Sequence, residues 1–413
     1  MFSPVSHFDL FCYGCGGAAD LEDAISCARC GEPRSLRVHT LPAVEHLKTR
    51  PGSMWHYIDL LPVASPEHVV TLGEGATPLV DALQFARRFG FSELRFKNEM
   101  ANPTGSFKDR QIAAAVTHAR ALGARTVAAV SSGNVAAATA AYAARAGLNA
   151  VLFMHGHAGQ GKIAQAAAYG ATVVRVDSPS PSRVFSLCIE ACARWGWRHV
   201  STAGMYEPFN VEGAKTIAYE LYQQYEGRLP DWVVVPVGGG GLLGGVWRGF
   251  LDLQRLGLIE APPRLAGIQA AGCAPLVRAL ERGLSFLDTL REPWPNPHTI
   301  AGGIADDILF DGHTALPALR MTDGMALAVE DGAIEEGRRL LAREVGLLCE
   351  LTSAVVIAAL PRLAEKASGA RVCAVLTGSG VKEIGTLRDQ TFAPPLVAPD
   401  IDAVRAVLPE SVL

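Results

Sequence analysis

Short apolar runs alternate with longer alanine-rich stretches along most of this chain, and no other feature of the sequence restricts the fold as strongly. The runs include Thr126–Val130, Thr172–Val176 and Val372–Leu376, and the alanine-rich stretches include Gln111–Ala121 and Val135–Ala146. A short apolar run is typical of a strand buried on both faces, whereas the longer stretches have the spacing of amphipathic helices. Strands that alternate with helices predict βαβ units, and therefore an α/β fold with parallel sheets.

Length and charge exclude several classes of protein. The chain has 413 residues, with 37 Lys and Arg against 41 Asp and Glu, for a formal net charge of −4. At about 150 residues per domain, this length predicts two or three domains. A chain with 49% hydrophobic and 19% charged residues is not disordered. Its mild negative charge provides no basic footprint for nucleic acid or for an anionic membrane surface.

No segment has the pattern of a membrane span or a secretion signal. The most apolar stretch is interrupted by Pro236 and four glycines, whereas a span needs about 18 apolar residues in succession. The N-terminus lacks a basic region and a small-residue cleavage site. We therefore expect a cytoplasmic protein, in which the five scattered cysteines (188, 192, 273, 349 and 373) are buried side chains without a chemical role.

Four further cysteines form two CxxC pairs near the N-terminus: Cys12, Cys15, Cys27 and Cys30. A glycine follows each pair, and the short spacing lets both sulfurs of a pair reach one ion. Four thiolates favour structural Zn²⁺, so we predict a zinc-ribbon module over residues 1–38. The alternatives are four ordinary thiols or a pair of disulfides. Mixed acidic and basic residues around the cysteines provide no nucleic-acid surface.

Ligands of parallel α/β sheets bind beyond the carboxyl ends of the strands, where loops lead into helices. The first such loop reads NPTGSFKDR over residues 102–110 and places Lys108 at the start of a helix. The helix macrodipole disfavours a cation there, which lowers the pKa of the amine and favours a nucleophile that forms Schiff bases. The alternative is a solvated surface lysine.

Three other loops share this position relative to the strands. The segment SSGN (131–134) suits a carboxylate at a helix N-terminus, although an ordinary helix cap has the same composition. The glycine turn Gly238–Gly241 can wrap a phosphate with its amides, but it matches neither nucleotide motif. The fourth loop is TGSG (377–380).

Together these loops resemble pyridoxal-phosphate enzymes of fold type II, and the threonine synthase family most closely, over roughly residues 70–395. The resemblance implies two α/β lobes: a large one formed by residues 39–119 and 206–413, and a small one formed by residues 120–205. The cofactor would lie between them. Family members are commonly homodimers, so the resemblance also implies a homodimer.

The resemblance also implies roles for single residues. Lys108 would hold pyridoxal phosphate covalently and then move protons. The turn Gly238, Gly239, Gly240 and Gly241 would bind the cofactor phosphate. Asn134 would bond the ring hydroxyl, and the substrate carboxylate would be bound by Ser131, Ser132, Gly133 and Asn134. Thr377, or alternatively Ser379, would face the ring nitrogen. Because a hydroxyl cannot keep that nitrogen protonated, elimination or replacement at the β-carbon of an amino acid is favoured.

Three positions depart from threonine synthases. The phosphate turn is all glycine, as in threonine and serine dehydratases; Asn210 stands where an arginine is typical, and Ser379 where a histidine is typical. Losing an arginine from a phosphate site costs on the order of 3 kcal/mol. Lys162, Lys215 and Arg110 are the cations that would compensate, and the alternative is that they are solvated helix residues.

We therefore expect a lyase or synthase whose small amino-acid substrate, with or without a nucleophilic co-substrate, differs from phosphohomoserine. The alternatives are true threonine synthesis, a dehydratase-type ammonia lyase, a β-replacement like that of cysteate synthase, and a non-catalytic zinc-ribbon protein. Glu350 falls in a family stretch near the cofactor ring, and the Asp306–Asp307 pair is interpreted as a solvated or capping turn.

Overall fold

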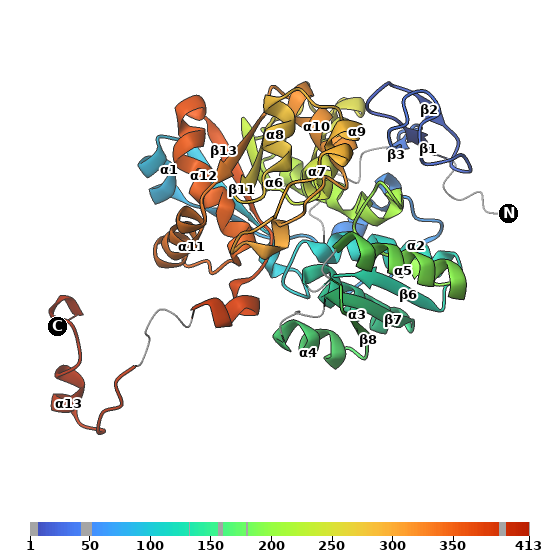
Figure 1. Cartoon of the computed structure of the whole chain (residues 1–413). Coiled ribbons are helices and arrows are strands. Elements are labelled where there is room, and N and C mark those ends of the chain that lie inside the picture. The colour runs from blue at the N-terminus through green and yellow to red at the C-terminus, as the bar shows by residue number, and fades with distance from the viewer. Residues whose placement is uncertain are drawn as a thin grey trace.

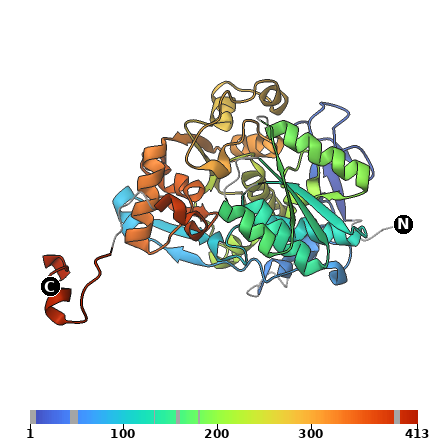
Figure 2. The same ribbon diagram turned by 60° about the horizontal axis from the view of Figure 1, so that its bottom comes forward.

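The computed structural model describes residues 7–42, 52–131, 133–155, 160–178, 181–387 and 394–412, which form three sheets and the helices around them (Figures 1 and 2). The strands are β1 (Phe8–Phe11), β2 (Ala18–Ala19), β3 (Ser35–Val38), β4 (Leu79–Asp81), β5 (Glu93–Asn98), β6 (Thr126–Val130), β7 (Asn149–His155), β8 (Thr172–Val176), β9 (Arg198–His199), β10 (Trp232–Pro236), β11 (Arg264–Ala270), β12 (Met325–Val329) and β13 (Arg371–Leu376). The α-helices are α1 (Leu83–Phe89), α2 (Lys108–Ala121), α3 (Asn134–Ala146), α4 (Gln160–Ala168), α5 (Pro181–Trp195), α6 (Thr216–Gln224), α7 (Gly241–Arg255), α8 (Pro275–Glu281), α9 (Phe286–Arg291), α10 (Gly312–Met321), α11 (Asp331–Val345), α12 (Leu351–Ala367) and α13 (Ile401–Arg405).

The largest sheet has six strands in the order β12-β11-β10-β13-β5-β4. All neighbours are parallel except β4, which pairs antiparallel with β5 at one edge. Alternate residues of the central strand β10 face two separate cores: Val233 packs in the cluster that holds Trp247 of α7, and Val234 packs in the one that holds Val355 of α12. Helices on both faces explain why β10 is apolar throughout.

The second sheet has four parallel strands in the order β8-β7-β6-β9. Helix α3 packs against one face of β6, where Ala136 joins the cluster of Val127. Helix α5 covers the other face, where Cys188 and Cys192 pack with Ala128, as the one-turn spacing of these cysteines predicts. The α/β class with parallel sheets is confirmed. The exact division into lobes at residues 119/120 and 205/206 stays a prediction.

The N-terminal three-stranded sheet, β2-β1-β3, packs directly on the large sheet's helices, beside α7 and α10 (Figure 1). The ring centroids of Tyr13 and Trp247 are 4.9 Å apart. The Arg248 guanidinium donates to the carbonyl of Leu36 at 3.2 Å, and the Ser35 hydroxyl bonds the His313 ring at 3.1 Å. Residues 7–38 therefore share a hydrophobic core with the helix that follows the glycine turn.

A buried network of charged side chains fixes the start of α2. Arg110 donates to both carboxylate oxygens of Glu99 and of Glu220, and Lys97 donates to Glu220 at 2.6 Å. All four side chains are fully buried. Burial alone would raise the pKa of Glu220, but Arg110 and Lys97 outweigh it and lower the pKa to about 2. Because every charge has a hydrogen-bonded partner, the network tolerates its burial.

No helix among the described residues is both long enough and apolar enough to span a lipid bilayer.

The buried network generates a stability prediction. In Glu220→Gln, Arg110 and Lys97 keep their charges but each loses an ionised carboxylate partner, so the free energy of unfolding should fall by about 3–5 kcal/mol. Urea unfolding followed by circular dichroism measures this change. The control is Glu336→Gln, which removes an exposed partner of Arg339 and should cost less than about 1 kcal/mol. Equal losses in the two variants would contradict the importance of the buried network.

Candidate active site

Two of the predicted loops are joined by backbone hydrogen bonds. The Phe107 amide donates to the carbonyl of Thr377 at 2.9 Å, and the Ser379 amide donates to the carbonyl of Gly105 at 3.0 Å. Ser106 and Gly378 form an antiparallel bridge between them. The loops at 102–110 and 377–380 are far apart in the sequence, but they meet because β5 and β13 are neighbouring parallel strands.

Lys108 is the first residue of α2, so this helix begins three residues earlier than the alanine-rich stretch predicts. The additional turn is closed by the Asp109 and Arg110 amides, which donate to the carbonyls of Ser106 and Phe107. The partly buried Lys108 amine donates to Thr202 Oγ1 at 2.7 Å and to Gln111 Oε1 at 3.0 Å. Burial lowers the pKa of Lys108 to about 8, although nearby Asp306 and Asp311 act in the opposite direction.

The third loop is held close to this pair through Asn134, the first residue of α3. Asn134 Nδ2 donates to Glu350 Oε1 at 2.8 Å, and Lys382 Nζ donates to Asn134 Oδ1 at 2.8 Å. The Ser131 hydroxyl accepts from the Gly133 amide at 3.0 Å. Ser132 lies outside the described residues.

The glycine turn connects β10 to α7 and is tightly packed. A Cβ on Gly238 would lie 2.6 Å from Asp306 Oδ2, and a Cβ on Gly241 would lie 2.9 Å from Asp311 Oδ2. Gly240 has a φ of +100°, which only glycine adopts readily. The first amides of α7 have no acceptor within the helix, so the turn offers donors for an anion.

Thr377 and Ser379 occupy different environments. The Thr377 side chain is buried and its hydroxyl lies 2.8 Å from that of Ser353 on α12. Ser353 Oγ also accepts from the amides of Thr377 and Gly378, which fixes this loop. Ser379 is partly exposed and bridges to Cys349 through its backbone.

Several polar residues of this cluster have no pattern in the sequence that reveals their role. Thr202 and Gln111 contact the Lys108 amine, and Lys382 contacts Asn134. Asp311 is 2% exposed, and burial raises its pKa to about 7. Asp306 is partly buried beside the glycine turn, where burial raises its pKa to about 6. The interpretation of the Asp306–Asp307 pair as a solvated or capping turn stays a prediction.

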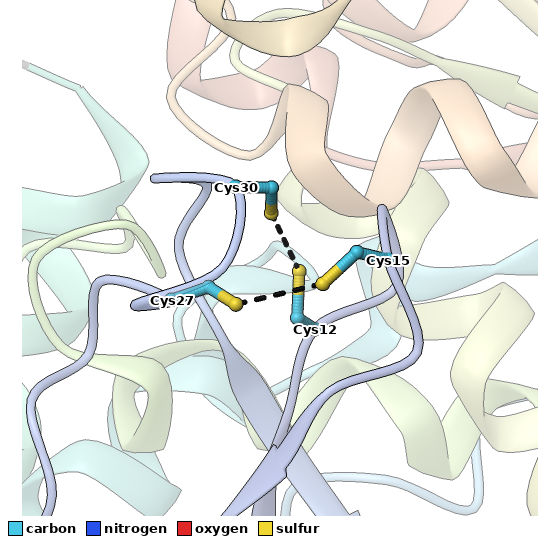
Figure 3. A group of neighbouring side chains, drawn as sticks. All are labelled: Cys12, Cys15, Cys27 and Cys30. Carbon is cyan, nitrogen blue, oxygen red and sulfur yellow. Dashed lines mark hydrogen bonds between the residues drawn. The ribbon is translucent and has the colours of Figure 1, made fainter.

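The four N-terminal cysteines converge on one point (Figure 3). Their sulfur atoms all lie within 4.8 Å of one another, with Cys12 and Cys30 3.4 Å apart and Cys15 and Cys27 3.5 Å apart. Gly16 and Gly31 have φ values of +71° and +78°, and their amides donate to the carbonyls of Cys12 and Cys27. Both CxxC pairs thus form the same tight turn, and four sulfurs so arranged suit a tetrahedral ion.

The cluster around Lys108 also fits pyridoxal phosphate. It combines an amine of lowered pKa, a glycine turn that excludes side chains, and two buried polar atoms without a partner, Gln111 Nε2 and Asp311 Oδ2. Buried polar atoms are normally hydrogen-bonded. Unpaired ones beside an anion-binding turn therefore indicate that a ligand belongs in this space.

Comparisons with known proteins agree with this chemistry. A family model described as "Pyridoxal-phosphate dependent enzyme" matches residues 70–378. A threonine synthase from Methanocaldococcus jannaschii is 34% identical over 411 residues, covering 97% of this chain and 99% of that relative. A threonine synthase from Mycobacterium bovis is 36% identical over 364 residues, covering 86% of this chain and 96% of that relative.

Solved structures share the architecture. A threonine deaminase from T.th. superposes with a TM-score of 0.62 at 26% identity, covering 73% of this chain and 92% of that one. An O-ureido-L-serine synthase superposes with a TM-score of 0.64 at 23% identity, covering 80% and 96%, and at this identity the likeness concerns the fold alone. The predicted fold-type II architecture is confirmed.

The pKa of Lys108 generates a labelling prediction for the cofactor-free protein. At pH 8 about half of an amine with a pKa of about 8 is neutral and reactive. A limiting amount of acetic anhydride should therefore acetylate Lys108 several-fold faster than Lys366, an exposed residue of α12. Peptide mass spectrometry at pH 6 and pH 8 measures both rates. The acetylation rate of Lys108 should fall by about fifty-fold at pH 6, where only about 1% of such an amine is neutral, while its preference over Lys366 persists. A uniform rate for both lysines at pH 8 would refute the lowered pKa.

Proposed function

The chain belongs to the pyridoxal-phosphate-dependent enzyme family, among its threonine synthase-like members, and from this premise we propose that the cluster around Lys108 is its active site. The protein is a pyridoxal-phosphate-dependent lyase that acts by elimination or replacement at the β-carbon of an amino acid. The observation that carries the assignment of the site is the Lys108 amine, which is partly buried, has a lowered pKa and lies in the same cluster as the glycine turn.

Lys108 is the residue that binds the cofactor covalently and then transfers protons at the substrate. Its pKa of about 8 supports both tasks, because a substantial neutral fraction exists near neutral pH. Thr202 and Gln111 orient the amine through their hydrogen bonds. The bound cofactor supplies an electron sink that stabilises negative charge at the substrate α-carbon.

The other residues of the proposed site bind the cofactor's phosphate and ring and the substrate's carboxylate. Gly238–Gly241 bind the cofactor phosphate through backbone amides at the N-terminus of α7. Asn134, held by Glu350 and Lys382, bonds the ring hydroxyl. Thr377, or alternatively Ser379, faces the ring nitrogen. Ser131, Ser132, Gly133 and Asn134 bind the substrate carboxylate at the N-terminus of α3.

Two reactions at the β-carbon are candidates: elimination, as in an ammonia lyase, and replacement by a second substrate. The all-glycine phosphate turn and the likeness to a threonine deaminase favour a dehydratase-type ammonia lyase. The threonine synthase relatives favour replacement by a nucleophilic co-substrate as in threonine synthase. A replacement like that of cysteate synthase is the alternative within this class. Product analysis by NMR with L-serine, L-threonine, O-phospho-L-serine and O-phospho-L-homoserine separates these reactions.

The N-terminal module is proposed to bind one structural Zn²⁺ through Cys12, Cys15, Cys27 and Cys30. Its contacts with α7 and α10 support a structural role. We further propose a homodimer, on the family resemblance alone. A reducing, cytoplasmic location is supported by nine free cysteines, four of which need their thiolates for the metal.

Replacing the proposed cofactor lysine tests the site. The wild-type protein loaded with cofactor should show a visible absorption band that borohydride bleaches, with Lys108 as the modified peptide. Lys108→Ala should lack the band and lose at least about 10²–10⁴-fold in kcat, because proton transfer is lost as well. Lys366→Ala is the matched control, since Lys366 is exposed. A Lys108→Ala protein that keeps the band and its activity would place the catalytic lysine elsewhere.

The zinc site makes a separate prediction. Elemental analysis of the purified protein should find one zinc per chain, and Cys12→Ser should abolish it. Because the module shares a core with α7, metal loss should also lower the melting temperature. Cys373→Ser is the control, since Cys373 is a buried cysteine of β13 outside the cluster. Metal retained at full occupancy in Cys12→Ser would contradict the four-cysteine site.

A further inference from the structure

The N-terminal module is bonded to α7, the helix that begins at the last glycine of the glycine turn (Figure 1). The Arg248 guanidinium donates to the carbonyl of Leu36 at 3.2 Å, and the Arg255 guanidinium donates to the carbonyl of Val38. Gly241, Arg248 and Arg255 are spaced seven residues apart, so they lie near one face of α7. Strand β3 of the module thus holds the helix face that carries the end of the turn.

The module also contacts α10 through a side-chain hydrogen bond. The Ser35 hydroxyl lies 3.1 Å from Nε2 of His313, the second residue of α10, and both residues are buried. Burial lowers the pKa of His313 to about 3, so the ring is neutral and has one nitrogen that donates and one that accepts. The other ring nitrogen, Nδ1, has no hydrogen-bond partner among the described residues. Ser35 is therefore the hydrogen-bonding group that orients this ring.

The start of α10 is in turn bonded to the glycine turn. The Asp311 amide donates to the carbonyl of Gly239 at 2.7 Å, and Asp311 precedes His313 by two residues. The starts of α7 and α10 are packed closely, because a Cβ on Gly244 would lie 2.0 Å from Thr314 Oγ1. A shift of either helix start therefore displaces the backbone amides of the turn.

The conformation of the module depends on its four cysteines. Its three strands have only two to four residues each, and their buried apolar side chains belong to the same cluster as Trp247 of α7. A segment of this size needs a staple such as a metal ion, and the binding of a structural metal is coupled to folding. Ser35 follows Cys30, the last cysteine of the cluster, by five residues. The position of Ser35 therefore depends on whether the cysteines hold an ion.

We propose that the N-terminal module positions the glycine turn for the cofactor phosphate, so that the binding of zinc and the binding of pyridoxal phosphate are positively coupled. The metal-bound module presents the Ser35 hydroxyl to α10 and the Leu36 carbonyl to α7. The two helices then hold the amides of Gly238–Gly241 in the arrangement that a phosphate requires. Ser35 is a positioning residue, because it acts through His313. The inference rests on the proposed function, because it assumes that the glycine turn binds the cofactor phosphate.

The test compares pyridoxal phosphate with pyridoxal, which lacks the phosphate group. Their dissociation constants are measured by absorption for the zinc-loaded full chain and for the chain stripped by a chelator, with circular dichroism to follow the fold. Both aldehydes react with the Lys108 amine, but only pyridoxal phosphate uses the turn. We expect zinc removal to weaken pyridoxal phosphate by at least about fivefold and pyridoxal by less than about twofold. A module that only stabilises the fold would weaken both equally, so the ratio of the two constants reports positioning.

Coupling between two binding sites is reciprocal. Pyridoxal phosphate should therefore raise the affinity of the chain for zinc by the same factor, whereas pyridoxal should change it little. Competition with a chromophoric zinc chelator measures this affinity. The same zinc affinity with and without pyridoxal phosphate would contradict the coupling.

Variants of the zinc-loaded chain test the named contact. Ser35→Ala should keep its full zinc content but bind pyridoxal phosphate about 2- to 10-fold more weakly, with little change for pyridoxal, because the His313 ring loses its partner. Ser35→Thr keeps the hydroxyl and should retain the wild-type ratio. Asp9→Asn is the matched control: it breaks an ion pair with Arg37 inside the module's own sheet and should leave the ratio unchanged. Where the metal-free chain unfolds, the ratio in Ser35→Ala decides the proposal.

Failure of the inference differs from failure of the proposed function. Zinc-loaded wild-type protein that binds pyridoxal phosphate more tightly than pyridoxal supports the proposed phosphate turn. If zinc removal and Ser35→Ala then both leave the ratio of the two constants unchanged, the inference is overturned and the proposed function stands. Zinc-loaded wild-type protein that binds the two aldehydes equally would contradict the proposed phosphate turn itself, and the inference with it.

Discussion

The ion network of Lys97, Glu99, Arg110 and Glu220 is the constraint on which the proposed site depends. It joins β5, the turn after β5, α2 and α6 at a place without access to water. Glu99 and Glu220 both hydrogen-bond the guanidinium of Arg110. Because Arg110 follows Lys108 by two residues, these bonds also fix the helical turn that carries the Lys108 amine. Compared with apolar residues of similar size, buried ion pairs add little to the stability of the fold. They do destabilise other packings of the same chain, in which a charge would be buried without its partner. The network therefore specifies the position of α2.

Backbone pairing then brings distant loops to that position. The loops at 102–110 and 377–380 are joined by hydrogen bonds between Phe107 and Thr377 and between Gly105 and Ser379. Glu350 and Lys382 both hydrogen-bond the side chain of Asn134. These contacts tie the N-terminus of α3, which follows strand β6 of the four-stranded sheet, to Glu350 at the start of α12 and to Lys382 after β13 of the six-stranded sheet.

The N-terminal module extends this arrangement to the glycine turn. Arg248 and Trp247 lie on α7, whose first residue is Gly241, and both contact residues 7–38. His313, which bonds Ser35, stands two residues after Asp311. The four-cysteine cluster is thus linked through short segments to the glycine turn and to the carboxyl group of Asp311 beside it.

Much of this protein follows from the sequence alone. The alternation of apolar runs and alanine-rich stretches determined the parallel α/β class, since both patterns report local burial. The loops at Lys108, Asn134, Gly238–Gly241 and Thr377 carry the family resemblance that indicated the cofactor, and the CxxC pairs predicted the cluster of four cysteines, because these motifs are contiguous in the chain. Asp306, Asp311, Gln111 and Thr202 carry no such motif. Their significance arises from burial and from neighbours that are far away in the chain. The sequence therefore determined which cofactor and reaction class this chain serves, whereas only the tertiary structure decided the charge around the Lys108 amine, because the electrostatic field at a buried site is the sum over residues that folding alone brings together.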